Sequence, residues 1–204
     1  MLSLLLMLPL GLRVQAQDWE WHPGYYYDLN NIKHTGLVQV STFDNGTAYG
    51  TSKFKSSEFF RFKTDEKSPQ QELYALDVQS VVVGADSIVV RHWFRTDRKG
   101  RVKKDTAGNE YSVASFLKVE LNSGETKVYS KLLDGNNYGT YTGYYYGKNA
   151  DNINDINTDT FAQVMSDIVK DAPDLVEKIN KEDFKLRKME KLINAYKTKK
   201  GITL

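Results

Sequence analysis

The chain has 204 residues, a formal net charge of +2 and no cysteine. Without cysteine it can form no disulfide, no thiolate zinc site and no lipid-modified cysteine behind a signal sequence, and it lacks a cysteine nucleophile. Because the net charge is close to zero, the overall charge does not favour binding to nucleic acid or to a membrane surface. Any preference for a charged partner must therefore be local.

The first residues have the pattern of an export signal. Residues 1–12 are almost wholly apolar, and Val14 and Ala16 supply the small residues of a cleavage site. The run is too short for a membrane-spanning helix, which needs about 20 apolar residues. We expect cleavage after Ala16 and a mature chain, residues 17–204, that is secreted or periplasmic, forms a single domain and has no transmembrane segment.

Residues 17–147 are predicted to be rich in β-strands. Runs of β-branched and aromatic residues alternate there with turn residues such as Asn45-Gly46 and Gly84, which tolerate a positive φ. The runs are residues 37–43, 57–62, 78–83, 87–94, 112–121 and 126–132. This spacing favours an antiparallel β-meander, either barrel-like or a sandwich. Residues 148–158, polar and rich in asparagine, are predicted to form a loop that leads to a helical part.

Near the C-terminus the apolar pattern takes the helical period of 3.6 residues. Thr160 begins a capping box, Pro173 suits the first turn of a second helix, and Asn180 with Asp183 is suited to cap a third. We expect about three amphipathic helices in residues 159–204. Because amphipathic helices need an apolar surface to cover, they should pack on the sheet, which makes the fold α+β.

The sequence contains no assembled catalytic or metal-binding motif. It has no GxSxG, Walker, HExxH or GxGxxG pattern. His22, His34 and His92 lie in separate segments without ligand spacing. His92 shares its strand parity with Ile88 and Val90, so we predict that it is a core histidine. We name no catalytic residue, no metal ligand and no cofactor.

Two acidic patterns are candidate sites. Residues 155–159 repeat the first oxygen-ligand positions of an EF-hand, but Thr160 stands where that loop needs glycine and Ser166 where it needs glutamate. Turn formation and helix capping by the Asx side chains is therefore the favoured interpretation. Carboxylate pairs for glycoside hydrolysis lie ~5 to 9.5 Å apart, a distance that only the fold can set. Candidate acids for such a pair, such as Glu58, Glu72, Glu110 and Glu120, lie at ordinary strand positions, where a solvated carboxylate is the default interpretation.

The sharpest local charge feature is a group of cations that is accompanied by one anion, Asp97. The cations are Arg91, Arg95, Arg98, Lys99, Arg101, Lys103 and Lys104. If this stretch joins the strand that starts near Ser87 to the strand that starts at Ser112, the cations crowd the tip of a long hairpin. There they can bind phosphate or carboxylate groups, for example of an anionic glycan or another envelope component. A solvated loop is the alternative interpretation.

Aromatic residues form two further groups. They are Trp19, Trp21, Tyr25, Tyr26 and Tyr27, and Tyr138, Tyr141, Tyr144, Tyr145 and Tyr146. Aromatic faces can stack on sugar rings, but consecutive side chains of a strand alternate sides, so at most every second tyrosine can share a platform. Because tyrosine is also favoured in strands, packing is the preferred interpretation over sugar binding.

Several of these pieces follow one another in a familiar order. They are Gly36-Leu-Val-Gln-Val, the hairpins 78–90 and 116–129, Tyr144-Tyr-Tyr-Gly, Lys170-Asp-Ala-Pro-Asp-Leu and Ile193-Asn-Ala-Tyr. In this order the chain resembles a broad group of secreted proteins of unknown function from Gram-negative bacteria. The resemblance implies export and a fold of this kind, and it implies no activity. It also implies that Asp86-Ser87-Ile88 and Asp105-Thr106-Ala107 are acceptor sequences for periplasmic O-glycosylation at Ser87 and Thr106.

Because no catalytic set is assembled in the sequence, the leading hypothesis is an exported non-catalytic binding or structural protein of the periplasm or cell surface. Its predicted contact surface is the basic stretch from Arg91 to Lys104. The alternative is a glycan-acting or other hydrolase whose acidic residues meet only in the fold. A cleft that holds two facing acids, or an acid beside His22 or His34, would favour the enzyme, whereas a convex sheet would favour the binding protein.

Overall fold

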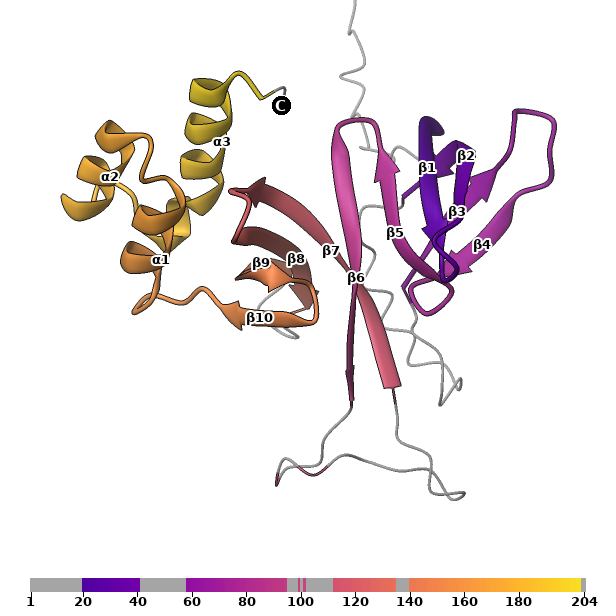
Figure 1. Cartoon of the computed structure of the whole chain (residues 1–204), viewed down its shortest axis with the longest axis horizontal. Helices are drawn as coiled ribbons and strands as arrows, with labels where there is room; N and C mark the ends of the chain where they lie inside the picture. Colours follow the sequence, from indigo (N-terminus) through magenta and orange to yellow (C-terminus); the bar gives the residue numbers. More distant parts are fainter. Residues whose placement is uncertain are drawn as a thin grey trace, which may run out of the picture.

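The computed structural model describes residues 20–40, 58–94, 99, 101, 112–134 and 140–202. The predicted signal peptide and the turn expected at Asn45-Gly46 lie outside these ranges. Within them the chain forms a ten-stranded antiparallel sheet that is followed by three α-helices (Figure 1). The fold is therefore α+β with a β-meander, as predicted, and the sheet is not closed into a barrel. No helix of these ranges has the length and apolar character needed to cross a membrane.

The strands are β1 (His22–Asp28), β2 (Lys33–Gln39), β3 (Phe59–Lys63), β4 (Gln71–Tyr74), β5 (Val78–Val83), β6 (Asp86–Phe94), β7 (Ser112–Asn122), β8 (Lys127–Asp134), β9 (Thr140–Asn149) and β10 (Asn152–Asp155). Their order in the sheet is β10-β9-β8-β7-β6-β5-β1-β2-β3-β4. The helices are α1 (Phe161–Ile168), α2 (Pro173–Asn180) and α3 (Met189–Lys200), and a 3₁₀ turn (Leu186–Lys188) leads into α3. Strands that follow one another in sequence are neighbours in the sheet, except β4 and β5, which are separated by β1, β2 and β3.

The first part of the sheet curls around a core of its own. Buried side chains of β1, β2, β3, β5, β6 and β7 pack together on the inner face of this curl. The ring centroids of Phe60 in β3 and Phe116 in β7 are 5.9 Å apart. Because β6, β5, β1 and β2 lie between these two strands in the sheet, the sheet must bend back on itself.

The sheet forks at β7. Residues 112–118 of this strand pair with β6, whereas residues 118–122 pair with β8. The edge of β7 that faces away from β6 is therefore open near Phe116, whose backbone N–H donates a hydrogen bond to Glu58 Oε2 at 2.6 Å. Lys131 Nζ of β8 donates to the other oxygen of Glu58, also at 2.6 Å. The Glu58 carboxylate thus bridges β7 and β8 where they separate.

The helices cover the sheet on the side formed by β7, β8 and β9 (Figure 1). Their buried side chains, among them Met165, Leu192 and Tyr196, pack against Leu121 of β7 and Val128 of β8. This arrangement gives each amphipathic helix the apolar surface that it requires. The prediction that the C-terminal helices pack on the sheet is confirmed.

The segment before the helices differs from the prediction. Residues 148–158, predicted to be a loop, contain the end of β9 and the whole of β10. The asparagines of this segment form the hairpin turn instead, because Asn149 Oδ1 accepts a hydrogen bond from the backbone N–H of Asn152 at 3.0 Å. An asparagine-rich segment is therefore compatible with a tight hairpin as well as with a loop.

Thr160 is the N-cap residue of α1, as predicted, but its capping box does not form, and the cap predicted for the third helix is wrong. Thr160 makes no side-chain cap hydrogen bond, and Asn157 Oδ1 instead accepts hydrogen bonds from two following backbone N–H groups, both at 3.0 Å. Asn180 belongs to α2, and a 3₁₀ turn rather than a cap by Asp183 leads into α3. Pro173 lies in the first turn of α2, as predicted. Short polar side chains at neighbouring positions can accept hydrogen bonds from the same backbone N–H groups, and the local sequence does not determine which side chain does so.

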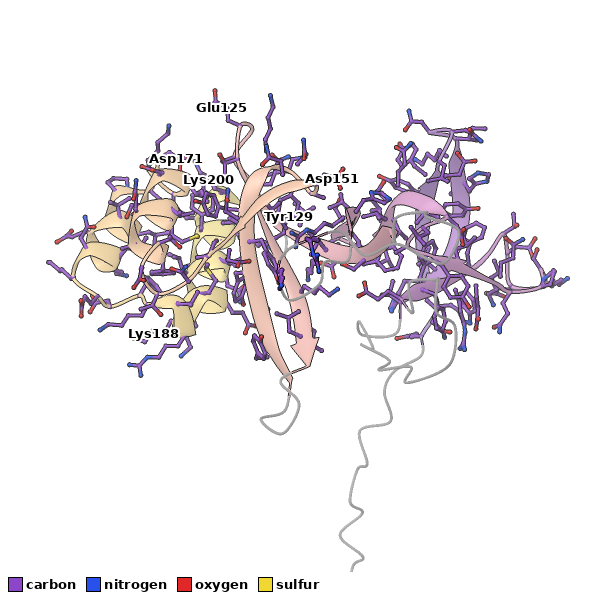
Figure 2. The ribbon with its side chains drawn as sticks, turned by 90° about the horizontal axis from the view of Figure 1, so that it is seen from below. Glu125, Tyr129, Asp151, Asp171, Lys188 and Lys200 are labelled. Carbon is purple, nitrogen blue, oxygen red and sulfur yellow. The ribbon has the colours of Figure 1, made fainter. Side chains whose placement is uncertain are left out.

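Asp171 ties the last helix to the turn before α2. Its carboxylate accepts a hydrogen bond from the Tyr196 hydroxyl at 2.9 Å and forms an ion pair with Lys200, which lies beside it in Figure 2. The hydrogen bond from Lys200, followed by that from Tyr196, holds the pKa of the Asp171 carboxyl below its ordinary value of 3.8. Burial, followed by the hydrogen bond to Asp171, raises the pKa of Tyr196 to about 12. The tyrosine therefore remains a donor at neutral pH.

This contact should stabilise the fold at neutral pH and not in strong acid. Because the pKa of Asp171 is depressed in the folded state, the stabilisation is complete above the ordinary value of 3.8 and is lost as the pH falls through the folded-state pKa. The variant Asp171→Asn should therefore have a lower thermal midpoint than the unaltered protein at pH 7, and the difference should shrink in acid. Calorimetry over a pH series measures this difference, and a constant difference would show that the Asp171 charge is not responsible.

Candidate functional site

A groove lies between α3 and the β5–β6 hairpin, with a volume of about 920 Å³. Figure 1 shows α3 and this hairpin on opposite sides of β7, and residues of β7 and β8 form the floor between them. The apolar part of the lining includes Val83, Ala85, Ile88, Leu121, Leu132 and Ile193. This cavity is termed the α3 groove.

A β-bulge places charged residues of β7 along the α3 groove. The register of β7 against β8 shifts between Val119 and Leu121, so Glu120 is accommodated as an extra residue. Lys118, Glu120 and Leu121 all line the groove. Lys118 has the same strand parity as Phe116, so the polar groove continues the face that is buried in the first core.

Lys118 carries a compensated charge in the groove. Its Nζ lies 2.8 Å from Asp86 Oδ1. Burial alone would lower the pKa of Lys118, but the hydrogen bond to Asp86 and the charges of Glu120, Asp86 and Glu190 raise it above its ordinary value. Lys118 is therefore charged at neutral pH.

The other two lysines that line the groove are also paired. Lys197 Nζ lies 3.4 Å from Glu120 Oε2, and Glu120 Oε1 accepts a hydrogen bond from Ser130 Oγ at 2.6 Å. Lys131 is the lysine that binds Glu58 at the fork of the sheet. These ion pairs fix the polar wall of the groove within the protein itself.

Tyr144 supplies a neutral hydrogen-bonding group to the groove. Burial, followed by the charges of Glu120 and Glu190, raises the pKa of Tyr144 to about 12. Its hydroxyl is therefore protonated at neutral pH and can donate a hydrogen bond to a ligand. Other neutral polar side chains of the lining include Ser87, Asn122, Ser130, Thr142 and Asn194.

Three acids line the α3 groove, Asp86, Glu120 and Glu190, and the charges of the last two raise the pKa of Tyr144. Glu120 is already engaged by Ser130 and Lys197, whereas Glu190 is exposed in the first turn of α3. Among the described residues, no group of three or more His, Asp or Glu side chains is placed to hold a metal ion.

A second acid lies beside His34. The Nε2 atom of His34 is 3.0 Å from Asp28 Oδ2, and the imidazole stacks on the Tyr26 ring with centroids 4.6 Å apart. The other oxygen of Asp28 accepts hydrogen bonds from the backbone N–H groups of Asn30 and Ile32. The bond from His34, followed by that from Ile32, lowers the pKa of Asp28. Both carboxylate oxygens hold the β1–β2 turn, so this Asp–His pair has a structural role.

His92 is not a core residue, and that prediction is wrong. Its side chain is 44% exposed, and its Nδ1 lies 3.5 Å from Asp151 Oδ1 in the β9–β10 turn. Ile88 and Val90 are buried, as expected from their parity. The pairing of β6 with β5 ends at Val89, so His92 lies at an open edge where Asp151 accepts a hydrogen bond from its backbone N–H at 2.8 Å.

The structure describes three of the seven cations of the basic stretch. Arg91 lies within β6, with its guanidinium carbon 5.8 Å from the centroid of the Tyr145 ring. Lys99 and Arg101 are exposed. The remaining members, Arg95, Arg98, Lys103 and Lys104, lie outside the described residues. The last residue of β6, Phe94, pairs with the first residue of β7, Ser112. Residues 95–111 therefore connect two paired strands, as the hairpin interpretation requires.

The tyrosines alternate sides, as predicted. Tyr26 is buried in the first core, whereas Tyr25 and Tyr27 contact each other edge to face with centroids 5.8 Å apart. Tyr144 packs against the core under the helices, and Tyr145 packs against a small cluster around Leu117 and Tyr129. Figure 2 shows Tyr129 near Asp151.

Of the two predicted glycosylation sites, Ser87 is half-buried at the α3 groove, and Thr106 lies outside the described residues. The sequence did not indicate Lys118 and Glu190 as groove residues, and it indicated Tyr144 only as one of the tyrosines that could stack on a sugar ring. One signal for Lys118 was available, because this charged residue continues the alternate positions of a strand whose earlier members are buried.

No family model matches the chain, and no curated protein or solved structure matches it either. A functional assignment therefore has to come from the groove and the surfaces described above.

Proposed function

We propose that this chain is an exported, non-catalytic binding protein of the periplasm or cell surface that holds its ligand in the α3 groove. The groove carries the proposal, because its volume of about 920 Å³ is that of a ligand site. Its three lysines are held in ion pairs, so little further ordering of these side chains is needed when a ligand binds. The signal-like pattern of residues 1–16 supports export.

The groove suits a ligand that is neutral overall and partly apolar. Its lysines already compensate carboxylates, so an anionic ligand would compete with existing ion pairs. Apolar walls such as Ile88 and Ile193 stand near the neutral donor Tyr144. A neutral glycan segment has this combination, because sugar rings carry apolar faces between their hydroxyl groups. We therefore propose a neutral glycan as the groove ligand.

An anionic partner belongs to the basic stretch rather than to the groove. Lys99 and Arg101 are exposed and belong to the connection between β6 and β7. Clustered cations of this kind bind carboxylate or phosphate groups. In this proposal the stretch contacts an anionic glycan or another envelope component while the groove holds its own ligand.

A blocking substitution tests the groove. Asn194→Trp should place a large ring in the groove from the exposed side of α3 without removing core atoms. We expect at least a tenfold loss of glycan captured from an envelope extract, with an unchanged circular dichroism spectrum. Asn180→Trp is the matched control, because Asn180 is also an exposed helical asparagine and does not line the groove. Equal capture by the two variants would contradict the proposal.

The same capture experiment distinguishes the two surfaces. Reversing the charges of Arg98, Lys99 and Arg101 should remove acidic components from the captured material and leave the groove ligand bound. Loss of both together would show that the basic stretch and the groove act as one site.

A hydrolase is the second candidate, because Glu120 and Glu190 line the same groove as Tyr144. Cleavage by these acids would shorten the captured glycan, and Glu190→Gln would restore its full length without reducing capture. Mass spectrometry of the captured material decides between the candidates. An intact glycan recovered from the unaltered protein supports the binding protein.

A further inference from the structure

Two aliphatic side chains project from the turn between β1 and β2. Leu29 is 56% exposed and Ile32 is 54% exposed. In the part of the chain that the structure describes, the other large hydrophobic residues with comparable exposure are Tyr141 and Ile202, which lie on separate elements. Residues 29–32 therefore concentrate exposed apolar surface at one hairpin tip.

The exposure is not the result of a loosely held turn. Asp28 Oδ1 accepts hydrogen bonds from the backbone N–H groups of Asn30 and Ile32, both at 2.9 Å. The Asp28 carbonyl oxygen accepts a hydrogen bond from the Asn31 N–H at 3.0 Å, and the Asp28 N–H donates to the Ile32 carbonyl oxygen at 3.1 Å. Asn31 takes a φ of 62°, a left-handed conformation that asparagine tolerates. The turn thus holds Leu29 and Ile32 in fixed positions.

The same hydrogen bonds lower the free-energy cost of burying the tip in an apolar medium. Gln79 Nε2 donates to the carbonyl oxygen of Leu29 at 3.1 Å, so the turn is also tied to β5. The backbone N–H groups of Asn30, Asn31 and Ile32 all have acceptors within the turn. Because unpaired backbone groups are what makes an irregular segment costly to bury in an apolar medium, this turn can be buried at reduced cost.

The flanks of the tip have the composition of a membrane interface. Tyr27 pairs directly with Lys33 across β1 and β2, and the Lys33 ammonium lies 3.8 Å from the centroid of the Tyr25 ring. Tyrosine and lysine are amphipathic side chains that lie at the boundary between lipid and water. The one acid of the turn, Asp28, is bound by His34 and does not face the tip as an unpaired anion.

A lipid surface fits this tip better than a protein partner does. A stable protein interface buries about 800 Å² on each partner, far more than two aliphatic side chains supply. A bilayer needs no matching shape, and its affinity grows with each apolar group that enters it and with each cation near an anionic headgroup. We propose that the β1–β2 turn docks on a lipid bilayer, with Leu29 and Ile32 inserted and Lys33 at the headgroups.

Co-sedimentation with vesicles of phosphatidylethanolamine and phosphatidylglycerol tests this proposal. We expect weak binding by the full chain, half-maximal at about 1 mM accessible lipid. The double variant Leu29→Ser, Ile32→Ser should bind at least fivefold more weakly. Tyr141→Ser is the matched control, because Tyr141 is also 56% exposed and lies in β9, and it should bind like the unaltered protein.

The lysine contributes a separate readout. Lys33→Gln should weaken binding to the mixed vesicles and leave binding to pure phosphatidylcholine vesicles unchanged, because only the former carry negative charge. Circular dichroism of each variant confirms that the fold is retained. Absence of vesicle binding by the unaltered chain would overturn the proposal, as would equal losses in the turn and Tyr141 variants. If the turn variant instead lost a protein partner and no variant bound lipid, the tip would be a protein-docking element and the proposal would be wrong.

Discussion

Replacing Gly36 with alanine should destabilise the protein by about 3 kcal/mol or more, or prevent it from folding. Gly36 of β2 lies directly opposite Gly24 of β1, in the part of the sheet that curls around the first core. A Cβ atom at Gly36 would lie 2.3 Å from the Lys63 carbonyl oxygen, and one at Gly24 would lie 2.4 Å from the Val82 carbonyl oxygen. Both contacts are with the backbone of a neighbouring strand, so the strands themselves would have to move.

Gly143→Ala is the matched control for this prediction. Gly143 also lies in a strand, but a Cβ atom there would meet the Leu133 side chain at 2.7 Å and the Tyr145 hydroxyl at 3.1 Å. Because the ends of side chains can move, we expect a loss below about 1 kcal/mol. Urea-induced unfolding followed by circular dichroism compares the variants. Equal losses at Gly36 and Gly143 would show that the close approach of the strands does not determine the curl.

The elements that could be predicted are those whose formation depends on nearby sequence. Two runs rich in β-branched residues, 78–83 and 87–94, flank the turn residue Gly84, and they form the hairpin of β5 and β6. The 3.6-residue period near the C-terminus likewise marks α1, α2 and α3. By contrast, β1 pairs with both β2 and β5. The pattern of Tyr25 to Tyr27 indicates a strand but does not specify a distant partner, so the curl of the sheet could not be derived.

The candidate site depends on such distant contacts. The α3 groove forms only where the helices return to the sheet beside the β5–β6 hairpin, so Tyr144 and Glu190 meet through tertiary packing. Strand parity was informative for Ile88 and Val90, which are buried in the first core, and it failed for His92, whose exposed side chain lies beside Asp151 of the β9–β10 turn. Parity predicts which side of a strand a residue is on, whereas burial also depends on which neighbours reach that point.

Replacing Glu58 with alanine should destabilise the protein by about 2 to 3 kcal/mol. The Glu58 carboxylate accepts hydrogen bonds from the Phe116 N–H and from Lys131 Nζ, both at 2.6 Å. The side chains of Glu58 and Lys131 are only 15% and 14% exposed. Alanine removes the acceptor from both donors at the fork between β7 and β8, where no neighbouring strand replaces it.

Glu58→Gln separates the contribution of the hydrogen bond from that of the charge. The amide oxygen can still accept from Phe116, while Lys131 loses its opposite charge, so we expect a loss of about 1 to 1.5 kcal/mol. The double variant Glu58→Ala, Lys131→Met should recover part of the loss seen with alanine alone, because a largely buried ammonium no longer has to be accommodated. Urea-induced unfolding gives the free energies. If the double variant is no more stable than Glu58→Ala, the hydrogen bond to Phe116, and not the ion pair, is what joins β3 to the open edge of β7.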